Sequence, residues 1–491
     1  MRVAFVTPEL LALVRRTSLA EISEFLPQTL LSLGADLRLF LPFHQDVEAE
    51  RLIDLKKVGQ VEVEDGEERT TLEVHTGRLG ELPIVLIDHP VLFRSRHPYG
   101  DEEGPYSDNW RRYAVFTRGV LAAMRLIKFK PDVIHCVDWT TGLLPLIHRL
   151  EVADDKDHPA AKAGTYFGIH NLAMQGSFER EVLPKIGIPH HLFQHVEGIQ
   201  LGGKVNFLKA GAEFATVIGT HSPSMAERVQ TVERGDGLEE TFRRRKKELV
   251  GVLSGIDYRA WDPSHDPLLA QPFSADDNDP SVGKRKCKAT LQAGIRLDNG
   301  PRTPLVTIIG RFDSDSGFDI LAEALTPMLE RNLQLVLMGP GSPEILERVR
   351  TVEQTFTGRC RIIEGYNVNT AHTLLGGADM LILPAHYHAS NALCAIAMRY
   401  GVVPVVYAHS GLEDTVINAL EDPKKGTGIL FPNYNSDSLL AGIDAARALY
   451  KKAGDWKLML QRCLSQDFSW QESGRKYLKA YRRVTRRTRG Q

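Results

Sequence analysis

Short runs of apolar residues alternate with longer amphipathic segments along the whole chain. MRVAFV at the start is typical of a buried strand, and 18–33 places apolar residues at helical spacing. Comparable apolar runs follow at 37–42, 83–88, 132–138, 164–170 and 214–220, and a helical segment is predicted over 109–127. Continuous apolar strands separated by amphipathic helices indicate a parallel sheet that is covered on both faces. The first half therefore predicts a doubly wound α/β domain.

A second alternation follows a change of composition. Residues 251–301 are rich in Pro, Asp and Ser, which predicts a hinge or linker. Apolar runs then return at 304–310, 333–339, 360–365, 379–384, 402–407 and 428–431. An amphipathic helix is predicted over 468–484. We expect an N-terminal domain over 1–252, a linker over 253–301, a C-terminal domain over 302–467, and a helix with a basic tail over 468–491.

Composition narrows the partners and the location. The chain has 491 residues, of which 43% are apolar, and 60 basic residues balance 62 acidic ones. We therefore expect no nucleic-acid or membrane partner. With neither a signal peptide nor an apolar run of about 20 residues, the expected location is cytoplasmic.

Metal and cofactor signals are weak. The five cysteines are widely spaced and form no CxxC pair, so neither a disulfide framework nor a zinc site is expected. His190, His191 and His195 have no evident carboxylate partner, so we expect no metal and no cofactor.

Two doubly wound domains place their ligand sites at the carboxyl ends of the strands. Motifs in this chain follow the order VTPEL, HPYG, DVIHCVDWTTGLLP, IHNLAMQGSF, VNFLKAGAEFAT, GVLSGIDYRAWDP, GRFD, LVLMGPG, GGADMLILP and GVVPVVYAHSGLEDTV. In order and spacing, the chain resembles the bacterial glycogen synthase and plant starch synthase family. The resemblance implies a GT-B fold, with two Rossmann-like domains facing across a cleft and a C-terminal helix that crosses back to the first domain.

The same resemblance implies a reaction. Members of the family transfer glucose from ADP-glucose, or UDP-glucose in some relatives, to the end of an α-1,4-glucan with retention at the anomeric carbon. The implied partners are an α-glucan and ADP-glucose or ADP. Positions that match family residues at the donor or acceptor are Glu9, Asp138, His170, Asn171, Arg311, Gly339, Gly341 and Tyr366.

Other positions differ from the family pattern. Ser316 stands where the family has a lysine at the donor phosphates, and His388 stands where it has a glutamate at the donor glucose. The glycine loop Lys-Thr-Gly-Gly-Leu reads Arg15-Arg16-Thr17-Ser18-Leu19. Arg15 keeps a cation there, but a helix start with a capping box formed by Thr17 or Ser18 and Glu21 is an equal alternative. Ser254 replaces an asparagine, and Asn391, beside Ser390, replaces a glycine that lets backbone approach the phosphates. Ser390 and Asn391 can still direct helix N–H groups at an anion, and a plain helix start without a ligand is the alternative.

Two hypotheses follow. Loss of one cation facing the leaving group costs about 2.7–4 kcal/mol, or roughly 100-fold to 1,000-fold in rate. The first hypothesis is therefore a member with little or no turnover that binds glucan or nucleotide and regulates a partner such as an active synthase. The alternative is a working glucosyltransferase that uses Arg15, Arg16, Arg311 and His388 in altered roles.

Overall fold

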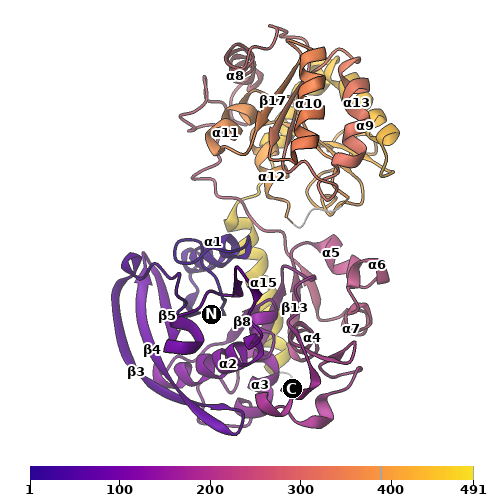
Figure 1. Ribbon diagram of the computed structural model, residues 1–491. Helices are drawn as coiled ribbons and strands as arrows, with labels where there is room; N and C mark the ends of the chain where they lie inside the picture. The colour runs from indigo at the N-terminus through magenta and orange to yellow at the C-terminus, as the bar shows by residue number, and fades with distance from the viewer. Residues whose placement is uncertain (387–389, 490–491) are drawn as a thin grey trace. The chain divides into compact units, whose positions relative to one another are not determined.

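The computed structural model describes residues 1–386 and 390–489, which form two compact units (Figure 1). The first unit comprises Met1–Leu253 and Trp470–Gln491, and the second comprises Ser254–Ser469. Each unit is an α/β domain with its own sheet and core.

The sheet of the first unit has nine strands in the order β14-β13-β9-β8-β1-β2-β5-β4-β3. The first seven are parallel, as predicted from their continuous apolar runs, whereas β4 and β3 are antiparallel. The strands are β1 (Arg2–Val6), β2 (Asp36–Pro42), β3 (Ile53–Asp65), β4 (Glu68–Leu79), β5 (Leu82–Asp88), β8 (Val133–Val137), β9 (Gly164–Ile169), β13 (Val217–Thr220) and β14 (Leu249–Gly251).

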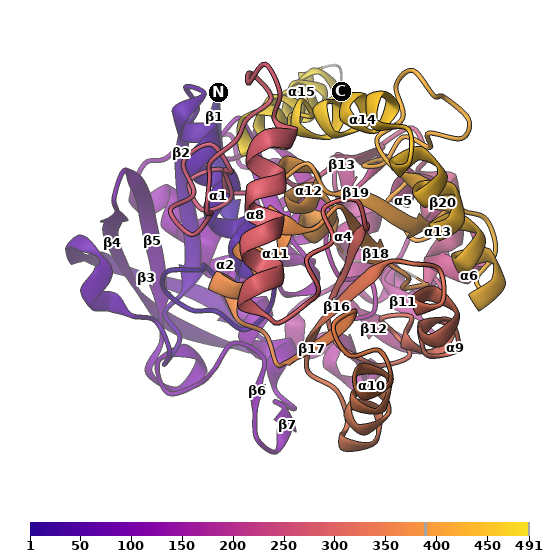
Figure 2. The same cartoon turned by 90° about the horizontal axis from the view of Figure 1, so that it is seen from above.

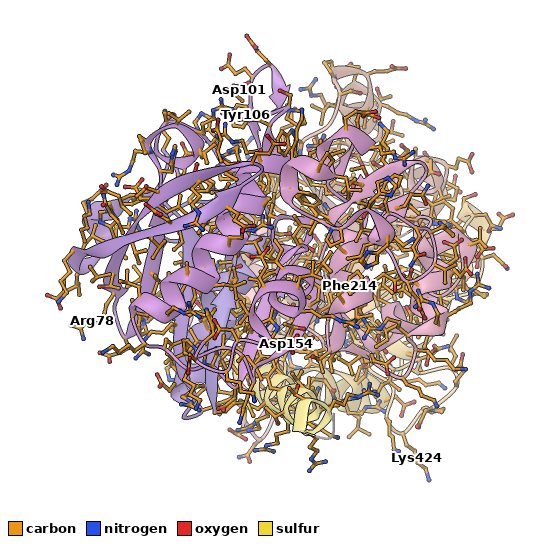
Figure 3. All side chains as sticks on the ribbon, turned by 90° about the horizontal axis from the view of Figure 1, so that it is seen from below. Arg78, Asp101, Tyr106, Asp154, Phe214 and Lys424 are labelled. Atoms are coloured by element: carbon orange, nitrogen blue, oxygen red, sulfur yellow. The ribbon has the colours of Figure 1, made fainter. Side chains whose placement is uncertain are left out.

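The helices of this unit are α1 (Leu19–Ser32), α2 (Asn109–Leu126), α3 (Leu144–Ile147), α4 (Phe207–Phe214), α5 (Pro223–Arg228), α6 (Val232–Gly235), α7 (Glu239–Arg244) and α15 (Trp470–Arg489). Small strands complete it: β6 (Gly100–Asp101), β7 (Gly104–Pro105), β10 (Ser177–Phe178), β11 (Gln200–Leu201) and β12 (Lys204–Asn206). The β6–β7 hairpin projects from the unit in Figure 2, and Figure 3 labels Asp101 and Tyr106 there.

The C-terminal helix α15 packs against the first unit, as expected. It lies beside α1 and against β8, β9 and β13 (Figure 1). Its buried Tyr481 hydroxyl lies 2.6 Å from Nδ1 of His135 in β8. Arg487 forms an ion pair with Glu248 at 2.5 Å, so the segment predicted as a basic tail continues the helix. The last segment of the chain thus completes the core of the first unit.

The second unit contains a six-stranded parallel sheet in the order β17-β16-β15-β18-β19-β20. Its strands are β15 (Leu305–Ile309), β16 (Gln334–Gly339), β17 (Cys360–Glu364), β18 (Met380–Leu383), β19 (Val403–Tyr407) and β20 (Ile429–Phe431). Its helices are α8 (Ser281–Gly294), α9 (Phe318–Leu329), α10 (Pro343–Thr355), α11 (Val368–Gly377), α12 (Ala392–Arg399), α13 (Ser436–Tyr450) and α14 (Ala453–Leu464). In Figures 1 and 2, α8 lies beside α11, and α9 lies beside α13. This doubly wound arrangement confirms the predicted fold class.

The segment 253–301, predicted as a hinge or linker, contains the 14-residue helix α8 of the second unit. The hydrophobic pattern of the segment did not indicate this helix, because two of the buried positions of α8 are lysines. Lys284 donates to the backbone oxygens of Leu375 at 2.8 Å and Tyr400 at 2.7 Å. Burial lowers the pKa of Lys284 to about 7. Backbone acceptors, rather than apolar contacts alone, hold this helix in place.

Lys288 holds α8 through a buried ion pair. Its Nζ lies 2.6 Å from Oδ2 of Asp379, at the start of β18, and 2.6 Å from the backbone oxygen of Thr303. Asp379 also accepts the backbone N–H of Leu305 at 2.8 Å. The pair therefore connects α8 to the starts of β15 and β18.

We predict that Lys288→Ala lowers the unfolding free energy of the second unit by about 3–5 kcal/mol, because it leaves the buried Asp379 carboxylate without its cation. Lys286→Ala, which removes an exposed lysine from the same helix, should change it by less than about 0.5 kcal/mol. Urea denaturation of both variants checks this, and equal effects would contradict the role assigned to the pair.

Candidate functional site

Three of the predicted site residues follow neighbouring strands of the first sheet. Glu9 comes after β1, Asp138 follows β8 and His170 follows β9, and these strands are adjacent in the order β9-β8-β1. The carboxyl ends of parallel strands lie on the same edge of a sheet. The fold thus gathers these side chains at one edge of the first unit.

Glu9 is fully buried, and its carboxylate accepts hydrogen bonds from the protein itself. The backbone N–H groups of Arg16 and Thr17 donate to Oε2 at 2.6 and 2.7 Å. The Thr17 hydroxyl donates to Oε1 at 2.8 Å, and the Tyr99 hydroxyl donates to the same oxygen at 2.5 Å. Glu9 thus has the geometry of a residue that positions the loop before α1, and its predicted contact with substrate stays a prediction.

The loop Arg15–Ser18 shows only part of one of its two predicted arrangements. Two of its N–H groups point at Glu9, so they are not available to a phosphate. The predicted helix start is present in part, because Thr17 Oγ1 accepts the N–H of Leu19 at 3.2 Å. The capping box is not completed, since Ser18 makes no side-chain cap and Glu21 pairs with Arg15 at 3.1 Å. Glu9, which follows β1, accepts the N–H groups that the phosphate-binding alternative assigned to a ligand.

The two arginines of this loop differ in how firmly they are held. Arg15 is exposed, and its pair with Glu21 is of the kind that contributes little to stability. Arg16 contacts both Asp46 and Nδ1 of His97, the latter at 2.7 Å. Arg15 is therefore the cation of this loop that can change partners easily.

Asp138 anchors the backbone of the neighbouring loop. Its Oδ1 accepts the N–H groups of His170 at 2.7 Å and Asn171 at 3.2 Å. Its backbone has φ +53°, a left-handed conformation that is costly for a residue other than glycine. Burial raises its pKa from 3.8 to about 7, although the two N–H donors oppose that shift. A strained, buried carboxylate fixes the positions of His170 and Asn171.

His170 remains a neutral imidazole at physiological pH, because burial lowers its pKa to about 3. Among the described residues, neither of its ring nitrogens has a hydrogen-bond partner, although both are buried. Buried polar atoms without partners are rare in folded proteins. A neutral imidazole offers one donor and one acceptor, which suits a hydroxyl-bearing ligand. Asn171 is exposed, and its side chain accepts the N–H of Ala173 at 3.1 Å.

Tyr99 lies in the HPYG motif, but no role was predicted for it from the sequence. Burial and the Glu9 carboxylate hold the pKa of Tyr99 well above its ordinary value, so its hydroxyl is a permanent donor to Glu9. His97 of the same motif contacts Asp46 at 2.8 Å. The contact between Tyr99 and Glu9 could not be predicted, because the two residues lie 90 positions apart in the sequence.

In the second unit, a cavity of about 410 Å³ opens where β15 and β18 end. Arg311, Ser316 and Ser390 line it, together with Asp315 and Gly310. The structure therefore brings three predicted site residues around one space. The volume is within the range of small-molecule sites.

Arg311 is the only cation that lines this cavity in the described part of the chain. Its Nε lies 2.9 Å from Oδ2 of Asp313, and the arginine side chain is 77% exposed. An exposed pair of this kind is weak, so an incoming anion can replace Asp313 at little cost. Asp313 also accepts the N–H of Ser316 at 2.9 Å, and both donors lower the pKa of Asp313.

Of the two predicted glycines, Gly339 occupies a place that excludes a side chain, and Gly341 occupies one that leaves little room for it. A Cβ on Gly339 would lie 1.7 Å from the backbone oxygen of Gly310, and one on Gly341 would lie 3.1 Å from Cβ of Phe312. They let the loop after β16 approach the GRFD segment. Tyr366 follows β17 and is 59% exposed.

The start of α12 is described only in part. Ser390 Oγ accepts the N–H of Ala392 at 3.2 Å, and the buried Asn391 makes no side-chain cap of the helix. Asn391 Nδ2 lies 3.5 Å from the backbone oxygen of Ser254. His388 lies outside the described residues, so its predicted role stays a prediction.

One group of potential metal ligands occurs in the described residues, namely Glu73, His75 and Asp88. Both carboxylates already have cationic partners: Asp88 pairs with Arg94 and Glu73 with Lys57, each at 2.5 Å. His195, predicted to have no carboxylate nearby, lies 3.4 Å from Glu240, and both are exposed. Neither arrangement has the set of open ligands that a structural metal site requires.

We predict that Asp138→Asn makes the first unit more stable relative to wild type as pH rises. The pKa of Asp138 is higher in the folded than in the unfolded chain. Its contribution to the free energy of unfolding is therefore largest when the side chain is protonated, and that contribution is lost as pH rises toward 7. Asparagine keeps the acceptor oxygen and carries no charge. Between pH 5 and 8 the difference in unfolding free energy should grow in favour of the variant by about 2–3 kcal/mol. Urea denaturation at several pH values measures it, and a pH-independent difference would contradict the raised pKa.

Comparisons with known proteins show the family of the chain. The profile of the starch synthase catalytic domain matches residues 2–244, and that of the glycosyl transferases group 1 matches 303–448. The chain is 35% identical to a glycogen synthase of Geotalea uraniireducens over 98% of both chains. It is 34% identical to glycogen synthase 2 of Geobacter sulfurreducens over 100% of both.

Solved structures give the same result. The catalytic domain of starch synthase IV from Arabidopsis thaliana, bound to ADP and acarbose, superposes with a TM-score of 0.81 at 27% identity over 99% of both chains. A sucrose-phosphate synthase from Thermosynechococcus elongatus, at 16% identity and a TM-score of 0.57, shares the fold. No helix in the described residues is long and apolar enough to cross a bilayer. The chain belongs to the glycogen and starch synthase family of GT-B glycosyltransferases.

Proposed function

We propose that this protein is an active retaining glucosyltransferase that transfers glucose from ADP-glucose to the end of an α-glucan. Its relatives named glycogen synthase match it over nearly their whole length, and the starch synthase IV structure contains ADP and acarbose. These relatives favour the active alternative over the hypothesis of lost turnover. The observation that carries the proposal is the convergence of Arg311, Ser316 and Ser390 on one cavity at the strand ends of the second unit.

The donor phosphates are assigned to this cavity. Its 410 Å³ is enough for the diphosphate, and Arg311 offers a planar fork that suits phosphate oxygens. Phosphate binding would exchange the exposed Arg311–Asp313 pair for a stronger, charge-assisted one. Little covalent chemistry is required of the protein, because the departing diphosphate needs mainly cations and N–H groups.

The edge of the first sheet is assigned to the recognition of sugar hydroxyls. The unpartnered ring nitrogens of His170 can donate to one sugar hydroxyl and accept from another. Asp138 holds that imidazole through the backbone of His170, and Glu9 and Tyr99 hold the adjacent loop. Because these partners are in place without a ligand, little ordering energy is needed on binding.

The substitutions then define a slow enzyme rather than an inert one. Ser316 leaves Arg311 as the one cation lining the described cavity, and the N–H groups of the Arg15–Ser18 loop are occupied by Glu9. We expect the stabilisation of the departing diphosphate in the transition state to be lower by about 2.7–4 kcal/mol, the amount associated with the loss of one donor at the leaving group.

The test measures ADP release and glucan growth with ADP-glucose and glycogen, for wild type and Ser316→Lys side by side. We expect glucan-dependent turnover by wild type, and a rise in kcat/KM of roughly 100-fold when the variant restores a second cation at the cavity. Ser314→Lys, which adds the same charge at an exposed position nearby, is the matched control and should change the rate little.

No detectable transfer by wild type or by Ser316→Lys, with ADP-glucose or UDP-glucose, would overturn the proposal. Retained binding of ADP and glycogen in that case would favour the regulatory alternative. An equal gain from Ser314→Lys would show that net charge, not the position of the cation, limits the rate.

A further inference from the structure

A second concave site lies at the opposite edge of the first sheet. A cavity of about 380 Å³ is lined by residues where β1 and β2 begin and by the segment between α2 and β8. Part of its wall comes from β4 and β5, and the next residue along β4, Arg78, is labelled at the outer edge of the unit in Figure 3. Glu9 and Asp138 follow the other ends of β1 and β8, which places them about 17 Å away along a five-residue strand.

The walls of this cavity are strongly basic. Four cations line it, and one carboxylate, Asp36, does so. The four are Arg2, Arg38, Lys128 and Lys130. Since the chain as a whole carries a net charge of only −2, this concentration of positive charge is local.

The two lysines are free to meet a ligand. Among the described residues, neither the Lys128 nor the Lys130 side chain makes a hydrogen bond or an ion pair, and both residues are exposed. In the described ranges, 1–386 and 390–489, no carboxylate from a neighbouring element contacts the ammonium group of Lys128 or Lys130. Their charges face the cavity without compensation.

The two arginines are only partly engaged. Arg2 pairs with Asp132 at 3.2 Å through one terminal nitrogen, and Arg38 pairs with Asp36 at 2.6 Å through one terminal nitrogen. A guanidinium has five N–H donors, so each arginine keeps donors for a second acceptor. With Asp36 and Asp132 counted against the four cations, an excess of two positive charges remains.

The aromatic residue of the cavity does not offer a stacking surface. Phe129 is buried, and the Arg38 guanidinium lies over its ring at 5.2 Å from the centroid. A ligand that depends on base stacking would lack a partner here. Hydrogen-bond donors and positive charge are what the site provides.

We propose that this cavity binds a small anion that carries two or more phosphate groups, such as a pyrophosphate or a sugar bisphosphate. Two uncompensated lysines and two guanidinium groups match the charge and the many acceptor oxygens of such a ligand. The volume is in the range of small-molecule sites, and the covered Phe129 disfavours recognition of a nucleobase. The site is separate from the donor cavity, and its test does not depend on glucosyl transfer.

The test is calorimetric titration with inorganic pyrophosphate at constant ionic strength, in an Arg311→Ala background that weakens phosphate binding at the donor cavity. We expect one site, and at least about tenfold weaker binding in Lys128→Gly/Lys130→Ala. Lys128 has φ +55° after the end of α2, so glycine suits its backbone and the variant should fold. Orthophosphate should bind more weakly than pyrophosphate.

The matched control is Arg296→Gly in the second unit. Arg296 is also an exposed cation with positive φ directly after a helix, and it lies outside the cavity. Its loss should leave pyrophosphate affinity unchanged. Unchanged affinity in the Lys128/Lys130 variant, or equal weakening by Arg296→Gly, would overturn the proposal. Binding of duplex DNA or anionic vesicles that depends on the two lysines, without pyrophosphate binding, would overturn it in favour of a macromolecular partner.

Discussion

Two buried carboxylates that accept backbone N–H groups determine the shape of the site in the first unit. Glu9 holds Arg16 and Thr17, and Asp138 holds His170 and Asn171. A buried carboxylate without such donors would be costly, and the loop N–H groups would otherwise lack partners. Each carboxylate follows a strand, so the rigid sheet determines where both loops lie. The donors of these loops are committed before a ligand arrives.

The two units differ in how much of their predicted site they retain. The first unit keeps a complete set of positioning contacts, from the Tyr99 hydroxyl to the neutral imidazole of His170. The cavity of the second unit contains Arg311 but presents Ser316 where the family resemblance implies a second cation. The chemistry of such transfer depends mainly on charge at the leaving group. We therefore attribute the expected rate loss to one position rather than to a failure of the fold.

Hydrophobic patterns predicted the parallel strands, because burial on both faces leaves continuous apolar runs. They also predicted the C-terminal helix, whereas its return to the first domain was implied only by the family resemblance. They failed at α8, since Lys284 and Lys288 are buried through polar contacts that no hydrophobic pattern reports. The long β3–β4 hairpin was also not predicted. Its exposed, charged residues, such as Lys56 and Lys57, lack the continuous apolar run of the central strands.

The placement of some site residues could be predicted from the sequence, and that of others could not. Arg311, Ser316 and Ser390 converge as their motifs predicted, since all three follow strand ends of one sheet. The contacts of Glu9 were not predicted, since its donors come from the loop and from Tyr99, and the place near substrate that the resemblance implies stays a prediction. Such contacts join segments that are distant in the chain, as do Tyr481 and His135. A single sequence carries no direct signal for them.

The most direct measurement of the central claim is amide hydrogen exchange in the ligand-free protein over residues 10–20. If Glu9 holds this loop, the N–H groups of Arg16 and Thr17 exchange slowly in wild type and rapidly in Glu9→Ala, while protection of β8 and β9 is retained. Rapid exchange of this loop in the wild-type protein, or unchanged protection in the variant, would contradict a site that is organised before its ligand binds.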